Sequence, residues 1–132
     1  MTTKLSARTT LKVPELSEHQ IQSQFVKALT RIPDPCLGTA FAIPNAAKRS
    51  FKLMAMLRAE GFRTGMPDWC LPVPAGSYNA LWIEFKTSRG KASPEQVEMH
   101  KLLRRFGGLV HIATSSEAAV EMVLSYLRQR PV

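Results

Sequence analysis

The stretch from residue 78 to residue 86 separates apolar from charged side chains with a period of two. Leu81, Ile83 and Phe85 occupy alternate positions, and Glu84 and Lys86 occupy the positions between and after them. Because successive side chains of a β-strand point to opposite faces, a strand here buries the apolar set. A rise of roughly 3.3 Å per residue sets the two charged groups about 7 Å apart along the strand. The pattern therefore predicts a half-buried strand whose second face presents a carboxylate and an ammonium group.

A second strand is predicted just before this one, over residues 68–73. The segment 74–77 has the composition of a connecting turn, so the two strands are expected to form a β-hairpin. If they pair, Asp68 lies beside Glu84 and Lys86. A plain cross-strand ion pair would also explain the last two charges. The Gly-x-Pro-Asp turn that ends at Asp68 favours a functional interpretation.

Helical patterns surround the hairpin. Ser17 and Ser93 each stand three residues before a glutamine, which is the spacing of a capping box, and Pro94 occupies a first helical position. Helices are predicted over residues 17–30, 46–60, 93–106 and 116–128, and further short strands over 39–43 and 109–113. The order αβαββαβα predicts an α/β fold with a small mixed β-sheet flanked by helices. We expect a flexible arm over residues 1–15 and a single domain over residues 16–132.

The charge balance indicates a polyanionic partner. Eighteen Lys and Arg against ten Asp and Glu give a formal net charge of +8. Such a surplus favours nucleic acid, although many small proteins are basic for solubility alone. No apolar run approaches the roughly 20 residues of a spanning helix, and the N-terminus lacks the apolar stretch of a signal peptide. We therefore expect a cytoplasmic protein that is not secreted and has no membrane partner.

Several other chemistries find no support in the sequence. The chain has no Walker A loop and no GxGxxG motif, so no nucleotide cofactor is expected. Its three histidines lack the spacing of a zinc site and are given no role. Cys36 and Cys70 are far apart in the sequence and are expected to be buried thiols rather than a bridge.

Asp68 and Glu84 together suit a hard divalent cation. Two carboxylates at one point attract Mg²⁺ or Mn²⁺, which prefer oxygen ligands. A lysine at the position of Lys86 could orient or deprotonate an attacking water, or balance the charge that grows on a phosphate. These residue types indicate metal-assisted chemistry on a phosphate ester.

Motifs in one order along the chain resemble the VRR-NUC (virus-type replication-repair nuclease) branch of the PD-(D/E)xK nucleases. The motifs are Gly65-Met66-Pro67-Asp68, Trp82-Ile83-Glu84-Phe85-Lys86 and Ser93-Pro94-Glu95-Gln96. The segments Ser17-Glu18-His19-Gln20 and Ile43-Pro44-Asn45 fit the same order, so the resemblance covers roughly residues 16–113. It implies a restriction-endonuclease-like core.

The resemblance also implies roles for individual residues. Asp68, Glu84 and the backbone carbonyl of Phe85 would be metal ligands, Lys86 would be the catalytic lysine, and Glu18 would be an additional acid. A first-turn acid favoured by the helix dipole is the alternative for Glu18.

Gln96 would support the centre from the third helix. However, the capping box alone accounts for a glutamine there. Met99 also stands where the family often has an aromatic residue. Both interpretations of Gln96 stay open.

Hydrolysis of DNA phosphodiesters follows from the resemblance, with branched DNA (a Holliday junction or a flap) as substrate and a homodimer as the assembly. Phosphate contacts are expected from Asn45, Lys48, Arg49, Arg63, Arg89 and Lys91. The alternative is a non-catalytic nucleic-acid-binding module that retains the fold. The presence of every acid and lysine position favours the enzyme. A small partner-binding domain would leave Asp68, Glu84 and Lys86 unexplained.

Overall fold

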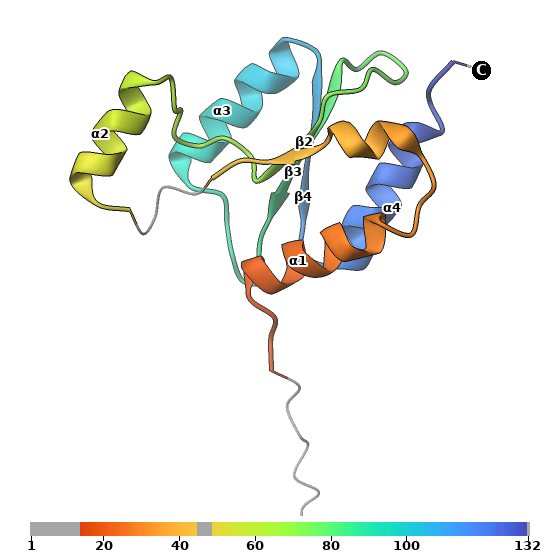
Figure 1. Cartoon of the computed structure of the whole chain (residues 1–132), viewed down its shortest axis with the longest axis horizontal. Coiled ribbons are helices and arrows are strands. Elements are labelled where there is room, and N and C mark those ends of the chain that lie inside the picture. The colour runs from red at the N-terminus through yellow and green to blue at the C-terminus, as the bar shows by residue number, and fades with distance from the viewer. Residues whose placement is uncertain (1–13, 45–48, 132) are drawn as a thin grey trace, which may run out of the picture.

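The computed structural model describes residues 14–44 and 49–131. Most of the predicted N-terminal arm, together with Asn45 and Lys48, lies outside these ranges. The elements, in chain order, are α1 (Glu18–Leu29), the 3₁₀-helix η1 (Pro35–Thr39), β1 (Phe41–Ala42), α2 (Phe51–Ala59), β2 (Trp69–Leu71), β3 (Ala80–Phe85), α3 (Pro94–Arg105), β4 (Gly108–Ala113) and α4 (Ser116–Leu127) (Figure 1). The predicted order αβαββαβα is confirmed, with η1 added after α1.

The strands form one mixed sheet in the order β1-β2-β3-β4. The first two pairings are antiparallel and the pairing of β3 with β4 is parallel, with α3 as the crossover between them. The predicted hairpin is confirmed, because Trp69 lies opposite Ile83 and Cys70 lies opposite Trp82. This register decides which side chains share a face.

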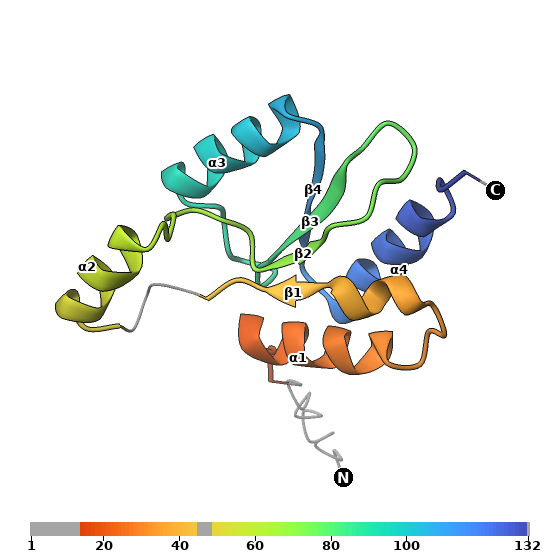
Figure 2. The same ribbon diagram turned by 45° about the horizontal axis from the view of Figure 1, so that its top comes forward.

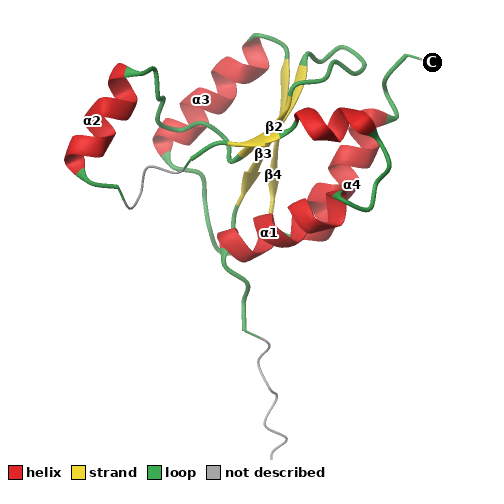
Figure 3. Ribbon diagram, in the orientation of Figure 1, coloured by secondary structure: helices red, strands yellow, loops and turns green. Residues whose placement is uncertain are grey.

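The two faces of the sheet are covered by different helices (Figure 3). Helices α1 and α4 pack on one face, where the core combines Phe25 of α1, Ile83 and Phe85 of β3, and Val123 of α4, all fully buried. Helix α3 lies on the other face, beside β4. Capping boxes start both α1 and α3, as the sequence predicted. Glu84 therefore points away from the apolar core and toward α3.

Helix α2 differs from its prediction. It begins at Phe51, with Ser50 as N-cap, so residues 49 and 50 are not helical, and residues 46–48 lie outside the described ranges. Only Met54 of this helix is buried, and Phe51 is 88% exposed. Figure 2 shows the reason, since α2 stands to the side of the sheet rather than over it. An apolar helical pattern here did not lead to burial.

Two further expectations concern the cysteines and the membrane. Cys36 and Cys70 are free thiols, and Cys70 is buried as predicted, whereas Cys36 is only half-buried. Within residues 14–44 and 49–131, no helix has both the length and the apolar character needed to cross a membrane.

The turn before β2 packs directly on the start of α3. Gly65 has a φ of +81°, and a Cβ atom at this position would lie 2.5 Å from the backbone oxygen of Glu95 and 2.7 Å from its carbonyl carbon. Real Cβ atoms do not come this close to backbone atoms. Only glycine therefore allows the turn to approach α3, and the approach brings the residues after the turn near the first turn of that helix.

We expect Gly65→Ala to lower the free energy of unfolding by about 2–4 kcal/mol, because backbone strain and overpacking add. Gly61→Ala is the matched control, since Gly61 also has a positive φ, +101°, but has nothing within 4 Å of its Cβ position. It should cost only about 1 kcal/mol. Urea unfolding followed by circular dichroism measures both. Equal losses in the two variants would contradict the close approach.

Candidate active site

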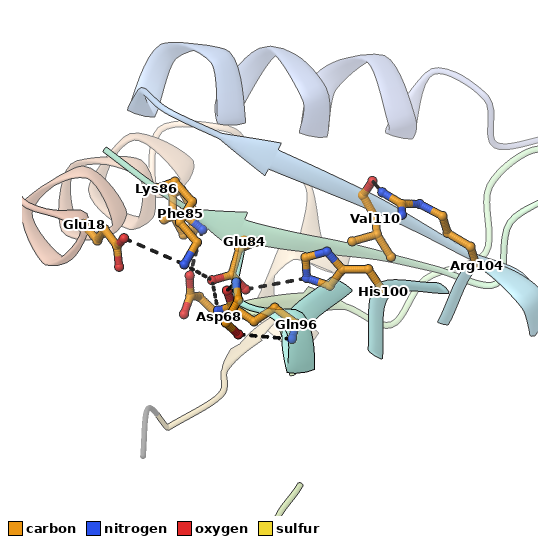
Figure 4. Close-up of polar contacts among 10 residues, drawn as sticks. Glu18, Asp68, Glu84, Phe85, Lys86, Gln96, His100, Arg104 and Val110 are labelled. Atoms are coloured by element: carbon orange, nitrogen blue, oxygen red, sulfur yellow. Dashed lines mark hydrogen bonds and ion pairs between the residues drawn. The ribbon is translucent and has the colours of Figure 1, made fainter. Parts of the chain in front are cut away.

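The strand register brings Asp68 opposite Glu84. The backbone N–H of Asp68 donates to the Ile83 carbonyl at 3.0 Å, and the Asp68 carbonyl accepts from the Ile43 N–H at 2.8 Å. Asp68 thus lies between the β1 and β3 sides of the sheet, just before β2. Its Oδ2 atom also accepts from the Phe85 N–H at 2.7 Å (Figure 4). The hairpin therefore does bring Asp68 to the charged face of β3.

Glu84 is held from two sides. Its side chain is 1% exposed, and its Oε1 atom accepts from Gln96 Nε2 at 2.7 Å. The same oxygen lies 3.6 Å from Lys86 Nζ. Gln96 keeps its capping role as well, because its Oε1 atom accepts from the Ser93 N–H at 2.9 Å. The amide oxygen of Gln96 therefore caps α3 while its amide nitrogen contacts Glu84, and a role of Gln96 in the chemistry stays a prediction.

The second oxygen of Glu84 has no hydrogen-bond partner among the described residues. This Oε2 atom is buried and faces the equally buried Nε2 atom of His100 at 3.8 Å, which also has no partner there. Buried polar atoms are nearly always hydrogen-bonded. These two facing atoms are therefore exceptions that need an explanation.

Burial dominates the electrostatics of the pair. It raises the pKa of Glu84 to about 8, with the neighbouring Asp68 charge as a second cause and the Lys86 ammonium opposing both. Burial also raises the pKa of Asp68, against the lowering effect of the Phe85 N–H. Two carboxyls in one desolvated place resist losing both protons. A divalent cation would relieve this repulsion.

The oxygen atoms of the centre suit Mg²⁺ or Mn²⁺, but few side chains supply them. Among residues 14–44 and 49–131, no group of three or more His, Cys, Asp or Glu side chains is arranged to hold an ion. Asp68 and Glu84 are the two carboxylates that meet. The backbone carbonyl of Phe85 and the Glu18 carboxylate stay predicted ligands.

Glu18 lies at the rim of the centre. Its Oε1 atom is 4.0 Å from Lys86 Nζ, and its side chain is 43% exposed. Glu18, Gln22 and Asp68 line one open hollow of about 460 Å³. Gln22 also donates to the Asp68 carbonyl at 3.4 Å, a contact that the sequence did not reveal. The first helix therefore faces the same open space as Asp68.

Of the described residues that are expected to contact DNA, Arg63 is placed at a hollow beside the centre. Arg63 lines a smaller hollow, of about 80 Å³, together with Asp68 and Gln96. Arg89 and Lys91 are exposed in the loop between β3 and α3, and Arg49 is exposed just before α2. Their contacts with phosphate stay predictions, as do those of Asn45 and Lys48, which lie outside the described residues.

The sequence assigns no role to the histidines, but the structure places one of them, His100, against Glu84. This residue is 2% exposed and is the buried residue of α3, whereas the C-cap residue Phe106 is 68% exposed. The helix ends at Arg105, so Phe106 leaves the helical direction. The signal was in the sequence: His100 follows Gln96 by four residues and so shares its helix face.

Comparison with known proteins agrees with this geometry. The VRR-NUC domain matches residues 16–117 of the chain. A solved structure described as a VRR_NUC domain protein superposes with a TM-score of 0.78 at 20% identity, covering 89% of this chain and 93% of that one. At this identity the likeness establishes the fold, which is the expected restriction-endonuclease-like α/β core. No curated protein matches the chain.

The matched segment contains both strands of the hairpin, both capping boxes and all the carboxylates of the centre. It spans well over half of the sequence. The chain therefore belongs to the VRR-NUC family.

Proposed function

We propose that this protein is a divalent-metal-dependent DNA endonuclease that hydrolyses phosphodiester bonds in branched DNA, of the Holliday-junction or flap type. Its family is of nuclease type, which supports DNA as the substrate. The observation that carries the proposal is the half-buried Asp68 beside the buried Glu84, with Lys86 Nζ 3.6 Å from Glu84 Oε1. Replication, repair or recombination in the cytoplasm is the expected setting.

Asp68 and Glu84 would hold the cation, with the Phe85 carbonyl and Glu18 as further oxygen donors. When bound, Mg²⁺ or Mn²⁺ would act as a Lewis acid on a phosphate oxygen and lower the pKa of a water. The chain itself aligns these oxygens. The Phe85 N–H fixes one Asp68 oxygen and the Gln96 amide fixes one Glu84 oxygen. Such alignment before substrate arrives is the main source of electrostatic catalysis.

Lys86 supplies positive charge between Glu84 and Glu18. Its side chain is 12% exposed and its Nζ atom lies between Glu84 and Glu18, at 3.6 and 4.0 Å. A held ammonium at this place can donate to a phosphate oxygen as negative charge develops, or orient the attacking water. Lys86 is therefore the residue whose charge we expect to act on the substrate.

DNA would reach the centre across an exposed basic rim. Arg63, at the smaller hollow, and Arg89 and Lys91, in the loop after β3, are exposed, and the whole chain carries +8. Phosphate contacts from such groups make affinity fall as salt rises. A homodimer would present two centres to a junction, and closed two-fold assembly is common among small proteins. The apolar residues of α4 are used in the core, so another surface would form the dimer.

The test compares labelled Holliday junctions, flaps, nicked duplexes and plain duplexes, each with Mg²⁺, with Mn²⁺ and with EDTA. We expect cleavage of the branched substrates with either metal and none with EDTA. Binding to every substrate without metal-dependent products would contradict the proposal and support a non-catalytic nucleic-acid-binding module. Equal cleavage of plain and branched duplex would contradict the preference for branched DNA alone.

A further inference from the structure

We propose that His100 is a positioning residue for Glu84. The Nε2 atom of His100 donates a hydrogen bond to Glu84 Oε2 when the centre holds its cation. Gln96 and His100 would then fix the two oxygens of one carboxylate, one each. This inference rests on the proposed metal-dependent function. It gives a role to a side chain that lies outside the sequence motifs named above.

The geometry comes from a single helix face. Gln96 and His100 are one turn apart on α3, so both side chains reach toward the same point of β3 (Figure 4). The Gln96 amide is 2.7 Å from Oε1, and His100 Nε2 is 3.8 Å from Oε2. The second distance is too long for a hydrogen bond, which needs about 3 Å. A movement of less than about 1 Å by the Glu84 side chain closes it.

Both atoms need a partner. Glu84 Oε2 and His100 Nε2 are the buried side-chain polar atoms that lack one within the described part of the chain. A histidine that merely filled the core would normally satisfy its ring nitrogens. Here the unpaired nitrogen points at the unpaired oxygen. The two orphan atoms are therefore best explained as a contact that forms in another state of the centre.

Arg104, one turn after His100 on α3, is directed elsewhere. Its guanidinium donates to the Val110 carbonyl at 3.2 Å, and this bond directs it toward β4. His100 is therefore the side chain, one turn after Gln96 on α3, that faces Glu84.

The experiment measures Mn²⁺ affinity by isothermal titration calorimetry on the whole chain. We compare the parent with His100→Phe, which keeps a ring but removes the donor, and with His100→Gln, whose amide nitrogen can stand near the position of Nε2. Loss of an outer partner of a metal ligand weakens metal affinity 10–100-fold. We expect about 10-fold weaker Mn²⁺ binding for His100→Phe and a change below about 3-fold for His100→Gln.

Thermal unfolding separates positioning from packing. Without metal, His100→Phe removes a buried unpaired polar atom, so its melting temperature should not fall below that of the parent. With Mn²⁺, the rise in melting temperature should be smaller for His100→Phe than for the parent. His111→Phe is the matched control. His111 pairs with Ile83 and shares its face of the sheet, which is not the face that carries Glu84. The Mn²⁺ affinity of the His111→Phe variant should therefore equal that of the parent.

The failures are distinguishable. A parent protein that takes up no Mn²⁺ would overturn the metal centre and the role of His100 with it. Parent-like Mn²⁺ affinity in His100→Phe would overturn the role of His100 alone. Equal losses in His100→Phe and His100→Gln, with a lower melting temperature in the absence of metal, would show that the ring only fills space.

Discussion

Replacing Lys86 by methionine should lower the cleavage rate by about 10²–10³-fold, the usual effect of removing one group that stabilises charge in a transition state. Methionine keeps a long unbranched side chain but cannot donate to a phosphate. Asp68→Asn should have an effect at least as large, because the amide keeps the shape but gives up the charge that attracts a cation. Single-turnover cleavage of a labelled branched DNA with saturating Mg²⁺ measures both rates.

Fold and DNA affinity should survive in both variants. Lys86 and Asp68 lie at the centre, whereas the exposed basic residues around it would supply most of the DNA affinity. Lys27→Met is the matched control for the lysine, because Lys27 is exposed in the last turn of α1. Its cleavage rate should equal that of the parent. Full activity of Lys86→Met or Asp68→Asn under Mg²⁺ or Mn²⁺ would remove the basis for the proposed centre.

Glu84→Gln should stabilise the metal-free protein at alkaline pH. The pKa of Glu84 is raised from an ordinary 4.5 to about 8, mainly by burial. Between these two values the folded protein keeps a proton that the unfolded chain has already lost. Folding stability therefore falls as pH rises from about 4.5 to about 8, and it stays low above pH 8. Asp68, whose pKa is also raised, acts in the same direction.

The glutamine variant lacks this loss because its amide does not ionise. We expect its melting temperature at pH 8.5, in EDTA, to exceed that of the parent, and the difference to shrink toward pH 5. The quantity to compare is the difference in melting temperature between the variant and the parent at each pH. In both proteins the buried His100, whose pKa is lowered from 6.5, adds a separate loss of stability at acid pH.

Saturating Mn²⁺ should reverse the order at pH 8.5, because the cation stabilises the ionised parent and has less to bind in the variant. Glu121→Gln is the control, since Glu121 is an exposed acid of α4. It should follow the parent at every pH. A Glu84→Gln variant that melts below the parent at pH 8.5 without metal would show that the buried carboxylate is already compensated within the protein.

The centre was largely readable from the sequence because it depends on local rules. Alternation along β3 predicted that Glu84 and Lys86 share a face, and the capping boxes predicted where α1 and α3 begin. Asp68 depended on one further condition, the pairing of β2 with β3. That pairing is itself a short-range hairpin. Predictions of this kind succeed because the residues that interact are close in the sequence.

Other features depended on tertiary packing that no local pattern encodes. Phe51 has the spacing of a core residue, but α2 stands beside the sheet and leaves this side chain 88% exposed. His100 has the residue type of a solvated helix position, but α3 turns it against Glu84. Gln22 contacts the Asp68 backbone across 46 positions of sequence. Each case requires the relative placement of two elements, which only the folded structure provides.

Gln96 has a consequence for how this domain can change over time. The Gln96 side chain caps the start of α3 and also aligns Glu84, so the start of the helix and the alignment of the centre depend on the same residue. A glutamate at this position could still complete the capping box with Ser93, but its carboxylate would have no donor to offer Glu84. A substitution of Gln96 therefore changes the support of Glu84 even where the fold tolerates it. We therefore expect substitutions of Gln96 to give variants that keep a stable fold but lack cleavage.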